Sequence, residues 1–220
     1  MANPVFSYAF IDFDSTLYET DQLVAAMWNV YKTYGVAEAD FLLTLDRAIN
    51  GASGDYFDFK FETQIDLLAA MGYKVPATVV LAQLQALLNT NYAAADAEVF
   101  LQRLRPLCQS IVLLTAGNEN FQQAKLQSTG LATYFDDTVI VSNSKEDYVK
   151  SVLPEDARGL FVNDQIEQNV RVRNLFSNLL VVGRKHPRRF GANEAAAEGI
   201  PYFSTLTEIV FYVEQNLSYV

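Results

Sequence analysis

Two carboxylates one residue apart are the first side chains in the sequence that could do chemistry. Asp12 and Asp14 follow the apolar run from Val5 to Ile11, which is typical of a buried strand. Open α/β sheets bind ligands at the carboxyl ends of their parallel strands, so both acids would lie at a binding edge. Buried charge there needs compensation, and a divalent cation is the obvious candidate. The alternative is that both acids only cap the following helix, and an Asp-x-Asp pair alone favours neither interpretation.

A hydroxyl group and a glycine turn follow the second predicted strand. The segment Thr115-Ala116-Gly117 comes directly after Ile111–Leu114 and leads into a helix predicted from Asn120. The free backbone amides at the start of a helix suit an anion such as a phosphate group. Taken alone, the simpler interpretation is that Thr115 is an ordinary N-cap and Gly117 an ordinary turn residue.

The ends of the next two predicted strands carry a lysine and a further acid. Lys145 closes the segment Ser142-Asn143-Ser144-Lys145 and begins a helix, where the macrodipole disfavours a cation unless an anion lies nearby. Asn163-Asp164 follows the fourth strand, and Glu167 lies three residues after the aspartate. Four strand ends therefore present Asp-x-Asp, Thr, Lys and Asp in that order.

The elements that must position these side chains form two patterns along the chain. From about residue 21 to 91 the sequence predicts only helices, at Leu23–Tyr34, Phe41–Ile49, Ile65–Met71 and Val79–Leu88. From residue 95 helices and strands alternate, which predicts a parallel sheet with right-handed crossovers, and the first strand joins this sheet across the helical insertion. The helices are Ala97–Leu107, Asn120–Thr129, Lys145–Leu153 and Ile166–Phe176, and the strands are Ile111–Leu114, Thr138–Val141, Gly159–Val162 and Leu179–Val182.

Composition disfavours several classes of protein. With 220 residues, 50% of them hydrophobic, the chain is expected to have a sizeable packed core. A formal net charge of −10 disfavours nucleic acids and anionic membranes as partners. The single cysteine, Cys108, cannot form an internal disulfide and suits a reducing cytoplasm. We find neither a membrane-length apolar run nor a signal-peptide pattern, so we expect a soluble, cytoplasmic protein.

Other catalytic mechanisms find little support in the sequence. His186 is the only histidine, so a Ser-His-Asp triad or a multi-histidine zinc site has one possible participant at most. No Walker-type loop and no dinucleotide-binding glycine fingerprint is present in the sequence.

The order of the motifs resembles that of the haloacid dehalogenase superfamily. The matching residues are Asp12 and Asp14 in the first motif, Thr115 in the second, Lys145 in the third and Asp164 in the fourth. The stretch Lys125-Leu126-Gln127-Ser128-Thr129-Gly130-Leu131, followed by Tyr134-Phe135-Asp136, is typical of the subfamily with a helical cap inserted after the first motif. The resemblance implies an α/β fold with a Rossmann-like three-layer core and a parallel sheet at residues 1–17 and 95–220. It also implies a small all-helical cap domain at residues 18–94.

Three positions depart from the usual motifs of this superfamily. Ser15 stands where the first motif usually has glycine or asparagine, and Asn163 stands where the fourth usually has glycine or aspartate. The second acid of the fourth motif often lies four residues after Asp164, where this chain has Gln168. Glu167 fits a variant with a spacing of three, so Asp164 is the better supported metal ligand of the two acids.

The resemblance implies a phosphohydrolase that needs Mg²⁺ and acts on a small phosphorylated metabolite. Asp12, Asp164 and the main-chain carbonyl of Asp14 would hold the metal. Asp12 would attack phosphorus and form an aspartyl-phosphate. Asp14 would protonate the leaving oxygen and then deprotonate the hydrolytic water. Dehalogenases of the superfamily generally lack this second aspartate, so Asp14 favours phosphate over halide chemistry.

The phosphate group itself would be held by the second and third motifs. Thr115, Ala116 and Gly117 would bind phosphate oxygens, and Lys145 would balance their charge. Two alternatives stay open, a phosphomutase of the same family and a non-catalytic protein of this fold that binds a phosphorylated ligand. The expected partner is a small phosphorylated substrate, without nucleic acid or membrane, and the expected state is a monomer or homodimer.

Two further segments are candidates for determining substrate specificity. Candidate pocket residues in and beside the loop Gly51–Phe59 are Tyr56, Phe57, Phe59, Arg47 and Lys60. The simpler interpretation is that the aromatic residues form the core of the cap and the charged residues are solvated. The basic cluster Arg184–Arg189 could bind a distal phosphate or RNA, although a solvated loop is again the simpler interpretation.

Overall fold

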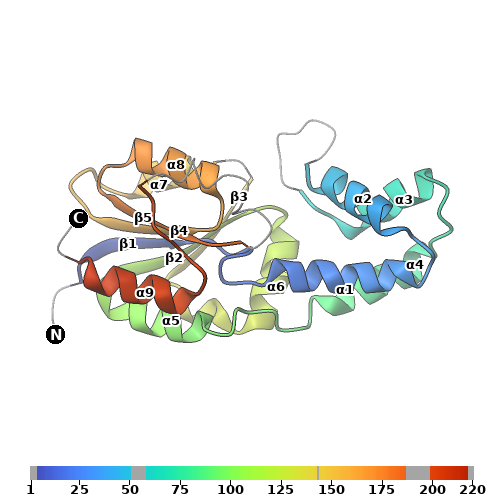
Figure 1. Ribbon diagram of the computed structural model, residues 1–220, viewed down its shortest axis with the longest axis horizontal. Helices are drawn as coiled ribbons and strands as arrows, with labels where there is room; N and C mark the ends of the chain where they lie inside the picture. Colours follow the sequence, from blue (N-terminus) through green and yellow to red (C-terminus); the bar gives the residue numbers. More distant parts are fainter. Residues whose placement is uncertain (1–3, 51–57, 143, 187–198, 218–220) are drawn as a thin grey trace.

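The computed structural model describes residues 4–50, 58–142, 144–186 and 199–217, and it contains one parallel sheet (Figure 1). Within these residues the sheet has six strands in the order β3-β2-β1-β4-β5-β6. The strands are β1 (Phe6–Ile11), β2 (Cys108–Ala116), β3 (Asp137–Val141), β4 (Gly159–Asn163), β5 (Leu179–Arg184) and β6 (Tyr202–Phe203). The chain runs outward from β1 to β3 and then returns to place β4 beside β1. Such a reversal of strand order is where open α/β sheets bind their ligands.

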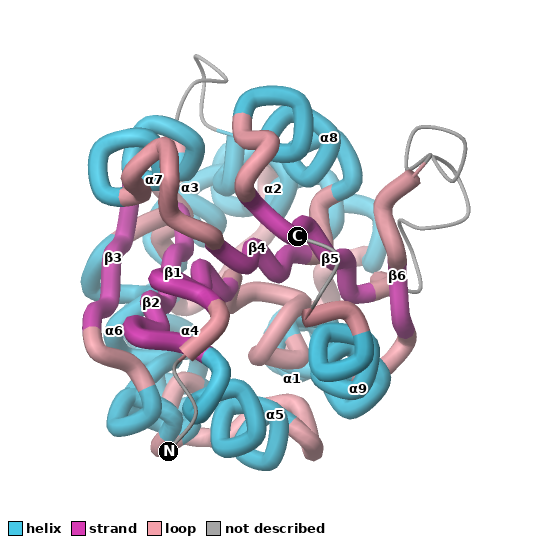
Figure 2. The backbone as a smooth tube through the Cα atoms, turned by 90° about the vertical axis from the view of Figure 1, so that its left-hand side faces the viewer, coloured by secondary structure: helices cyan, strands magenta, loops and turns pink. Residues whose placement is uncertain are grey.

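Helices cover both faces of the sheet, which gives the three-layer α/β architecture predicted from the sequence (Figure 2). One face packs against α5 (Ala97–Leu104), α6 (Glu119–Thr129) and α9 (Leu206–Gln215), and the other packs against α7 (Lys145–Val152) and α8 (Ile166–Leu175). Successive residues of a strand point to opposite faces. Ala9 and Ile11 accordingly belong to the first core, and Phe10 belongs to the second. Because both faces are covered, the strands are almost continuously apolar.

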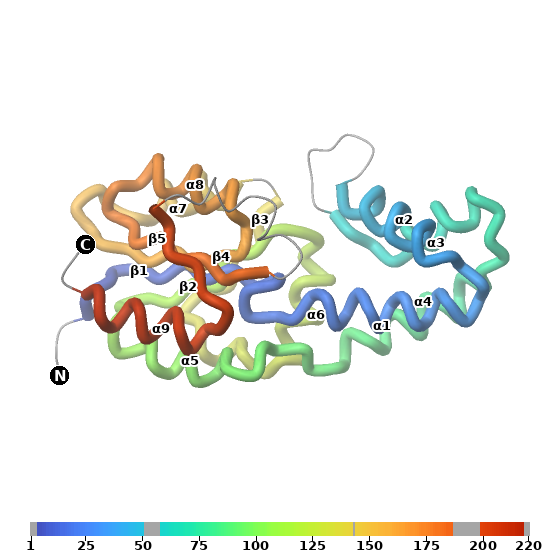
Figure 3. The backbone as a smooth tube through the Cα atoms, viewed as in Figure 1, coloured from blue at the N-terminus to red at the C-terminus, as the bar shows by residue number. Residues whose placement is uncertain are grey.

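A block of four helices follows β1 and lies beyond the carboxyl ends of the strands (Figure 3). These helices are α1 (Thr20–Lys32), α2 (Glu38–Asn50), α3 (Phe61–Ala70) and α4 (Ala77–Leu87). Their inward faces share a core in which the Phe41 ring lies 5.5 Å from Trp28 and 5.7 Å from Tyr31. We call residues 20–87 the helical block. It occupies the position in the chain expected for the cap, and its action as a separate cap domain is a proposal.

The observed elements differ from the predicted ones at several ends. The helix predicted for Ala97–Leu107 stops at Leu104, and a 3-10 turn with Pro106 in it covers Arg105–Leu107. Proline lacks an amide hydrogen and its ring disfavours the helical conformation of the preceding residue, which accounts for the early end. The second strand is longer than predicted at both ends.

Two elements near the C-terminus were not predicted at all. The short edge strand β6 pairs with β5 through Gly183 and Tyr202, and α9 follows it. The start of α9 carries a capping box in which Thr205 and Glu208 each accept a hydrogen bond from the backbone amide of the other. Its buried residues are Leu206, Ile209, Val210 and Val213. This spacing is a clear helical signal that the sequence analysis did not use. In the described ranges, no helix combines the length and the apolar character needed to cross a bilayer.

Candidate active site

A cavity of about 520 Å³ opens where the carboxyl ends of the strands face the helical block. Its lining contains every site residue that the sequence analysis singled out for the chemistry. These residues are Asp12, Asp14, Thr115, Ala116, Gly117, Lys145 and Asp164. They lie at or just after the carboxyl ends of four strands, β1, β2, β3 and β4, so the parallel sheet is what brings them together. The convergence agrees with the predicted positions of the motifs, whereas their chemical roles are proposals.

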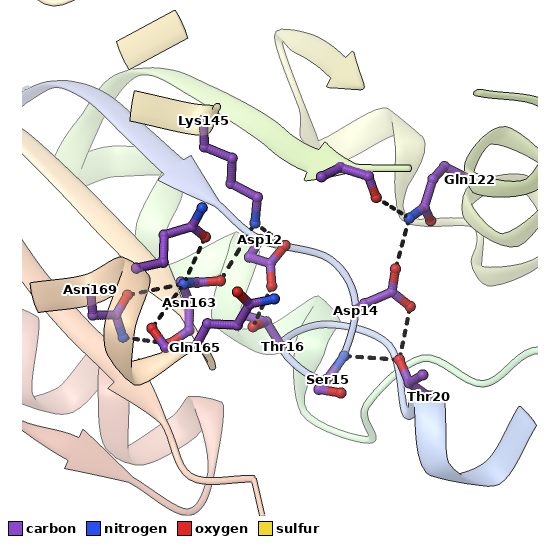
Figure 4. Close-up of polar contacts among 12 residues, drawn as sticks. Asp12, Asp14, Ser15, Thr16, Thr20, Gln122, Lys145, Asn163, Gln165 and Asn169 are labelled. Carbon is purple, nitrogen blue, oxygen red and sulfur yellow. Dashed lines mark hydrogen bonds and ion pairs between the residues drawn. The ribbon is translucent and has the colours of Figure 1, made fainter. Parts of the chain in front are cut away.

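The Asp12 carboxylate, just after the end of β1, accepts hydrogen bonds from a lysine and from a hydroxyl group (Figure 4). The Lys145 Nζ atom donates to Asp12 Oδ1 at 2.5 Å, and the Thr16 hydroxyl donates to Asp12 Oδ2 at 3.2 Å. Both members of the ion pair are buried, with Asp12 only 5% exposed. Removing one partner of such a pair leaves an uncompensated buried charge, at a typical cost of about 3–5 kcal/mol. The carboxylate is therefore held in one orientation at the floor of the cavity.

Lys145 is the first residue of α7, and its anionic partner is Asp12. The amide at the start of this helix is capped by Ser144, whose hydroxyl accepts from the Asp147 amide at 3.1 Å. The Lys145 side chain instead reaches into the cavity, where its ammonium group also lies 3.5 Å from Asn163 Oδ1. The ion pair with Asp12 thus compensates for a cation placed at the unfavourable end of the helix dipole.

Asp14 is held by three donors that the sequence analysis did not identify. Lys125 Nζ donates to Oδ1 at 2.5 Å, and the Thr20 hydroxyl donates to the same oxygen at 2.8 Å. The amide of Gln122 donates to Oδ2 at 2.8 Å. The N-cap of α1 is Glu19, so neither acid of the first motif caps this helix. The capping alternative considered for Asp12 and Asp14 is therefore wrong.

The Lys125 ammonium group is buried among aromatic rings, which strengthens its pairing with Asp14. Lys125 is 2% exposed, and its Nζ lies 4.9–5.4 Å from the ring centroids of Phe13, Tyr18 and Phe121. These rings attract the cation through their π faces and keep water away from it. A charge in such surroundings needs a counter-ion, and Asp14 supplies it.

The pKa of the Asp14 carboxyl lies below its ordinary value. Burial by itself raises this pKa, but the Lys125 charge and the hydrogen bonds from Lys125, Gln122 and Thr20 outweigh burial. Asp14 is therefore a carboxylate at neutral pH in this arrangement. In this form Asp14 can accept a proton. To act as a general acid, it must first bind a proton from solvent or from the substrate.

A spacing in the sequence could have identified the partners of Asp14. Gln122 and Lys125 lie three residues apart on α6, and helix geometry places such residues on one face. Both are buried beside Leu126, although α6 is otherwise a polar helix. The sequence analysis used Lys125 only as part of a stretch typical of a subfamily.

Thr115 is a buried strand residue and does not cap a helix. It belongs to β2 and is 2% exposed, whereas Asn118 is the N-cap of α6 and accepts from the Phe121 amide at 3.1 Å. The N-cap interpretation of Thr115 is therefore wrong. Gly117 has a φ of 135° and its amide donates to the Val141 carbonyl at 3.2 Å. That left-handed conformation favours glycine and turns the chain from β2 into α6.

The fourth motif combines a buried acid with an amide network. Asp164 is buried and lines the cavity. Its neighbour Asn163 is completely buried, and its amide donates to Gln168 Oε1 and Asn169 Oδ1, both at 3.1 Å. Glu167 is exposed and is not among the described residues that line the cavity.

The donor set fits a Mg²⁺ ion by its chemistry. Ile11 lies opposite Val162 in the pairing of β1 with β4, so Asp12 and Asp164 leave the sheet on neighbouring strands. Both are carboxylates in the same cavity, and Mg²⁺ in proteins is commonly held by one or two carboxylates together with water. In the part of the chain that the structure describes, no three His, Cys, Asp or Glu side chains gather as a metal cluster. The set proposed here uses two carboxylates and the main-chain carbonyl of Asp14.

Ser15 shows why the first motif usually has glycine or asparagine at this position. Its φ is +58°, in the left-handed region that most side chains avoid. The Ser15 amide donates to the Tyr18 carbonyl at 2.8 Å and to the Thr20 hydroxyl at 3.0 Å. These bonds close the turn that presents Asp14 to the cavity.

The remaining specificity candidates divide between the cavity and the surface. Phe59 lines the cavity. Lys60 forms an exposed ion pair with Asp58 at 2.7 Å, and Arg47 is exposed and outside the described lining. Tyr56 and Phe57, together with Asn143, lie outside the described residues.

The described part of the basic cluster has a structural contact. Arg184 donates to the Thr16 carbonyl at 2.7 Å and to Glu19 at 2.6 Å, which ties the end of β5 to the turn after β1. Residues 187–189 of the cluster lie outside the described ranges.

Cys108 is buried far from this turn at the start of β2, and burial raises the pKa of its thiol to about 12. A thiolate nucleophile is therefore not available from Cys108 at neutral pH.

Comparison with solved structures shows which fold this is. The HAD-hydrolase YfnB from Bacillus subtilis, solved bound to magnesium, has a TM-score of 0.64 at 15% identity over 94% of this chain and 98% of that chain. L-2-haloacid dehalogenase from Xanthobacter autotrophicus, solved with chloropropionic acid covalently bound, has a TM-score of 0.62 at 17% identity over 95% and 98%. A HAD family hydrolase from Deinococcus radiodurans R1, with bound phosphate and sodium, has a TM-score of 0.62 at 16% identity over 98% of each chain.

The comparisons confirm the fold that the order of the motifs implied. At these identities the likeness shows the fold alone, which is that of haloacid dehalogenase-like hydrolases. No protein-family model and no curated protein sequence matches the chain.

Proposed function

We propose that this chain, with its haloacid dehalogenase-like fold, is a Mg²⁺-dependent phosphohydrolase that acts on a small phosphorylated metabolite. The observation that carries the proposal is the clamped Asp12 carboxylate, with Lys145 at 2.5 Å and with Asp14 and Asp164 in the same cavity. Phosphate esters resist nucleophiles because they are anionic, so a nucleophilic carboxylate needs cations around it. The test is release of inorganic phosphate from a panel of phosphorylated metabolites in the presence of Mg²⁺.

The polar residues that the sequence analysis singled out each have a role in the proposed reaction. Asp12 attacks phosphorus and forms an aspartyl-phosphate as the bond from phosphorus to the leaving oxygen breaks. Asp14, after binding a proton from solvent, gives that proton to the leaving oxygen, so the product is an alcohol. Lys145 keeps Asp12 in position and offsets the charge of the phosphate oxygens. Thr115 and the backbone amide of Ala116 bind those oxygens. Gly117, whose own amide donates to the Val141 carbonyl, forms the turn beside them.

The second half of the reaction is hydrolysis of the aspartyl-phosphate. Asp14 takes a proton from the attacking water, which its carboxylate state permits. Asp12, Asp164 and the main-chain carbonyl of Asp14 would hold Mg²⁺. When bound, the ion would neutralise charge on the phosphate and help to align it for in-line attack.

Phosphate chemistry is favoured over halide chemistry by the surroundings of Asp14. The dehalogenase from Xanthobacter autotrophicus carries chloropropionic acid covalently bound, so the fold also supports attack on carbon. Expelling a halide needs no proton donor, and dehalogenases generally lack an acid at this position. Here three donors hold Asp14 in the cavity. Chloride release from 2-chloropropionate without phosphate release from any ester would overturn the proposal.

The further expectations from the sequence are also proposals. A phosphomutase would transfer the phosphoryl group to a second substrate alcohol, and a non-catalytic protein would bind the phosphate without turnover. The metabolite panel distinguishes the phosphohydrolase from both alternatives, because neither of them releases inorganic phosphate. A reducing cytoplasm suits the single buried thiol of Cys108. The state expected in solution is a monomer or a homodimer.

Lys125→Met is expected to lower kcat by up to about 10²-fold while changing KM little. Lys125 fixes the position of Asp14, and a displacement of a catalytic group by about 1 Å can cost that much. Free energy of unfolding should fall by about 1–3 kcal/mol, less than for a fully buried pair because the Asp14 side chain is 31% exposed. The measurements are steady-state kinetics and denaturant unfolding.

A double mutant separates positioning of Asp14 from general damage. If Lys125 acts through Asp14, adding Lys125→Met to Asp14→Asn should lower kcat no further. The matched control is Gln127→Met, an exposed residue of the same helix, which should keep full activity. Additive losses in the double mutant would contradict the positioning role.

A further inference from the structure

The end of the cavity that faces the sheet is polar, and the end formed by the helical block is apolar. From α1 and α2 the described lining residues are Thr20, Leu23, Val24, Met27, Leu45 and Ile49. Thr20 is at the polar end, where it donates to Asp14. The other five are aliphatic or methionine side chains, and they repeat at helical spacing on the faces of α1 and α2 that turn toward the cavity.

Aromatic rings close the cavity between the helical block and α6. Phe59 and Phe121 both line the cavity, and their ring centroids lie 5.2 Å apart at an interplanar angle of 69°. Phe61 packs edge-on against both rings, at 5.5 Å from Phe59 and 5.4 Å from Phe121. Edge-to-face packing of this kind is favourable and excludes water. The aromatic cluster therefore extends the apolar surface to the core side of the cavity.

The positive charges of the described lining all have anionic partners on the core side. Lys145 pairs with Asp12 and Lys125 pairs with Asp14, each at 2.5 Å. Arg171 of α8 pairs with Glu146 at 2.9 Å. Among the lining residues that the structure describes, those from α1 and α2 carry no charge. A second anionic group on a substrate would be desolvated there without a counter-ion, which is costly.

We propose that the substrate is a phosphate monoester whose organic part is apolar and uncharged. This inference rests on the proposed phosphate chemistry at the polar end, and it adds the class of the leaving alcohol. The phosphate group lies against Asp12, Thr115 and Lys145, and the organic group lies against α1, α2 and the aromatic cluster. Sugar bisphosphates and phosphorylated carboxylic acids are disfavoured, because their second charge would lie in the apolar end.

Binding of phosphonates tests this inference without requiring turnover. The probes are ethyl-, propyl-, butyl- and pentylphosphonate, with 4-carboxybutylphosphonate and pentane-1,5-bisphosphonate as charged analogues, titrated by calorimetry in the presence of Mg²⁺. Affinity should rise about fourfold with each added methylene group. Pentylphosphonate should bind at least about tenfold more tightly than either charged analogue, which must desolvate a second anion. The kcat/KM values of the corresponding phosphate esters should follow the same order.

A pair of adjacent variants on α1 tests the location of the organic group. Val24 is half-buried and lines the cavity, whereas Ala25 is exposed and is not in the described lining. Val24→Lys should weaken pentylphosphonate binding by about tenfold and strengthen binding of the carboxybutyl analogue, because it places a cation at the apolar end. Ala25→Lys adds the same charge next to it and should change both affinities by less than about twofold. Thermal unfolding of both variants shows whether each is folded.

The outcomes separate this inference from the proposed function. Tighter binding of a charged analogue, affinity that does not depend on chain length, or equal behaviour of the two variants would overturn the inference. If phosphate esters are hydrolysed but any of these contrary results is found, the phosphohydrolase proposal stands and the apolar substrate is rejected. The expected order of phosphonate binding, with no phosphate released from any ester, would reject the phosphohydrolase and keep the ligand class.

Discussion

Asp12→Asn is expected to abolish both turnover and phosphoenzyme formation with every phosphate ester. An amide cannot act as the nucleophile that forms the acyl-phosphate. The substitution keeps the size of the side chain and an acceptor oxygen for Lys145 or Thr16, but it leaves the buried Lys145 charge without its counter-ion. The free energy of unfolding should therefore fall by up to about 3–5 kcal/mol, and denaturant unfolding shows that the variant assayed is folded. The measurements are phosphate release in the steady state and mass spectrometry of acid-quenched enzyme.

The matched comparison is Asp14→Asn, in the same motif. This variant keeps the main-chain carbonyl at residue 14 but loses proton transfer, a step worth roughly 10²–10⁴-fold in rate. Slow turnover should therefore persist, most visibly with aryl phosphates, whose leaving groups need little protonation. A phosphoryl group found on Asp14, or normal turnover by Asp12→Asn, would show that the assigned roles are wrong.

Removal of Mg²⁺ is expected to abolish activity as completely as loss of Asp12. Asp164→Ala should have the same effect, because it removes one of the two carboxylates assigned to the metal. The fold should persist, because Asp164→Ala leaves the buried ion pair of Asp12 with Lys145 intact. The measurements are phosphate release with excess chelator, recovery on adding Mg²⁺, and calorimetric titration of Mg²⁺ into the wild type and the variant.

Glu167→Ala is the matched control for Asp164→Ala. It removes one negative charge three residues after Asp164 in the sequence, but Glu167 is exposed and is not in the described lining of the cavity. Its activity and Mg²⁺ affinity should stay close to those of the wild type.

Ca²⁺ should inhibit, since its longer and looser coordination would misalign the phosphate. Full activity in excess chelator would refute the metal requirement.

Local patterns in the sequence were sufficient to predict the architecture. Continuous apolar runs predicted the strands, and alternation with amphipathic helices predicted a parallel sheet, because a parallel connection needs a long crossover. The carboxyl ends of parallel strands share one edge, so the convergence of Asp12, Thr115, Lys145 and Asp164 also followed from the order of the elements. The predicted α/β fold was confirmed by the structure and by the comparisons.

The misses near the C-terminus have a local cause. The edge strand β6 is short and pairs with a single neighbour, so it carries almost no periodic signal of its own. The helix α9, in contrast, shows full amphipathic spacing and a capping box from Thr205 to Glu208, and its signal was present but unused. The helix α5 ends earlier than predicted because Pro106 follows it.

Side-chain pairing across the cavity was decided by the tertiary structure. The sequence placed Asp12 and Lys145 at one edge, but their contact joins residues 133 positions apart, and only packing of β1 against α7 brings the two charges to 2.5 Å. Asp14 and Lys125 are separated by 111 positions, and no local pattern links them. Lys125 is buried among aromatic rings, a setting that a lysine acquires only from its neighbours in space.

The sequence by itself determined the types of the groups that can do chemistry and their order along the chain, because residue types and the succession of strands and helices are local properties of the sequence. The tertiary structure decided which carboxylate each cation neutralises, that Thr115 is a strand residue, and that Glu167 is not among the described residues that line the cavity. It also decided the apolar character of the far end, since the lining comes from α1, α2 and α6 together. Electrostatic and hydrophobic interactions depend on distances in space, and residues far apart in the chain acquire those distances only when the chain is folded.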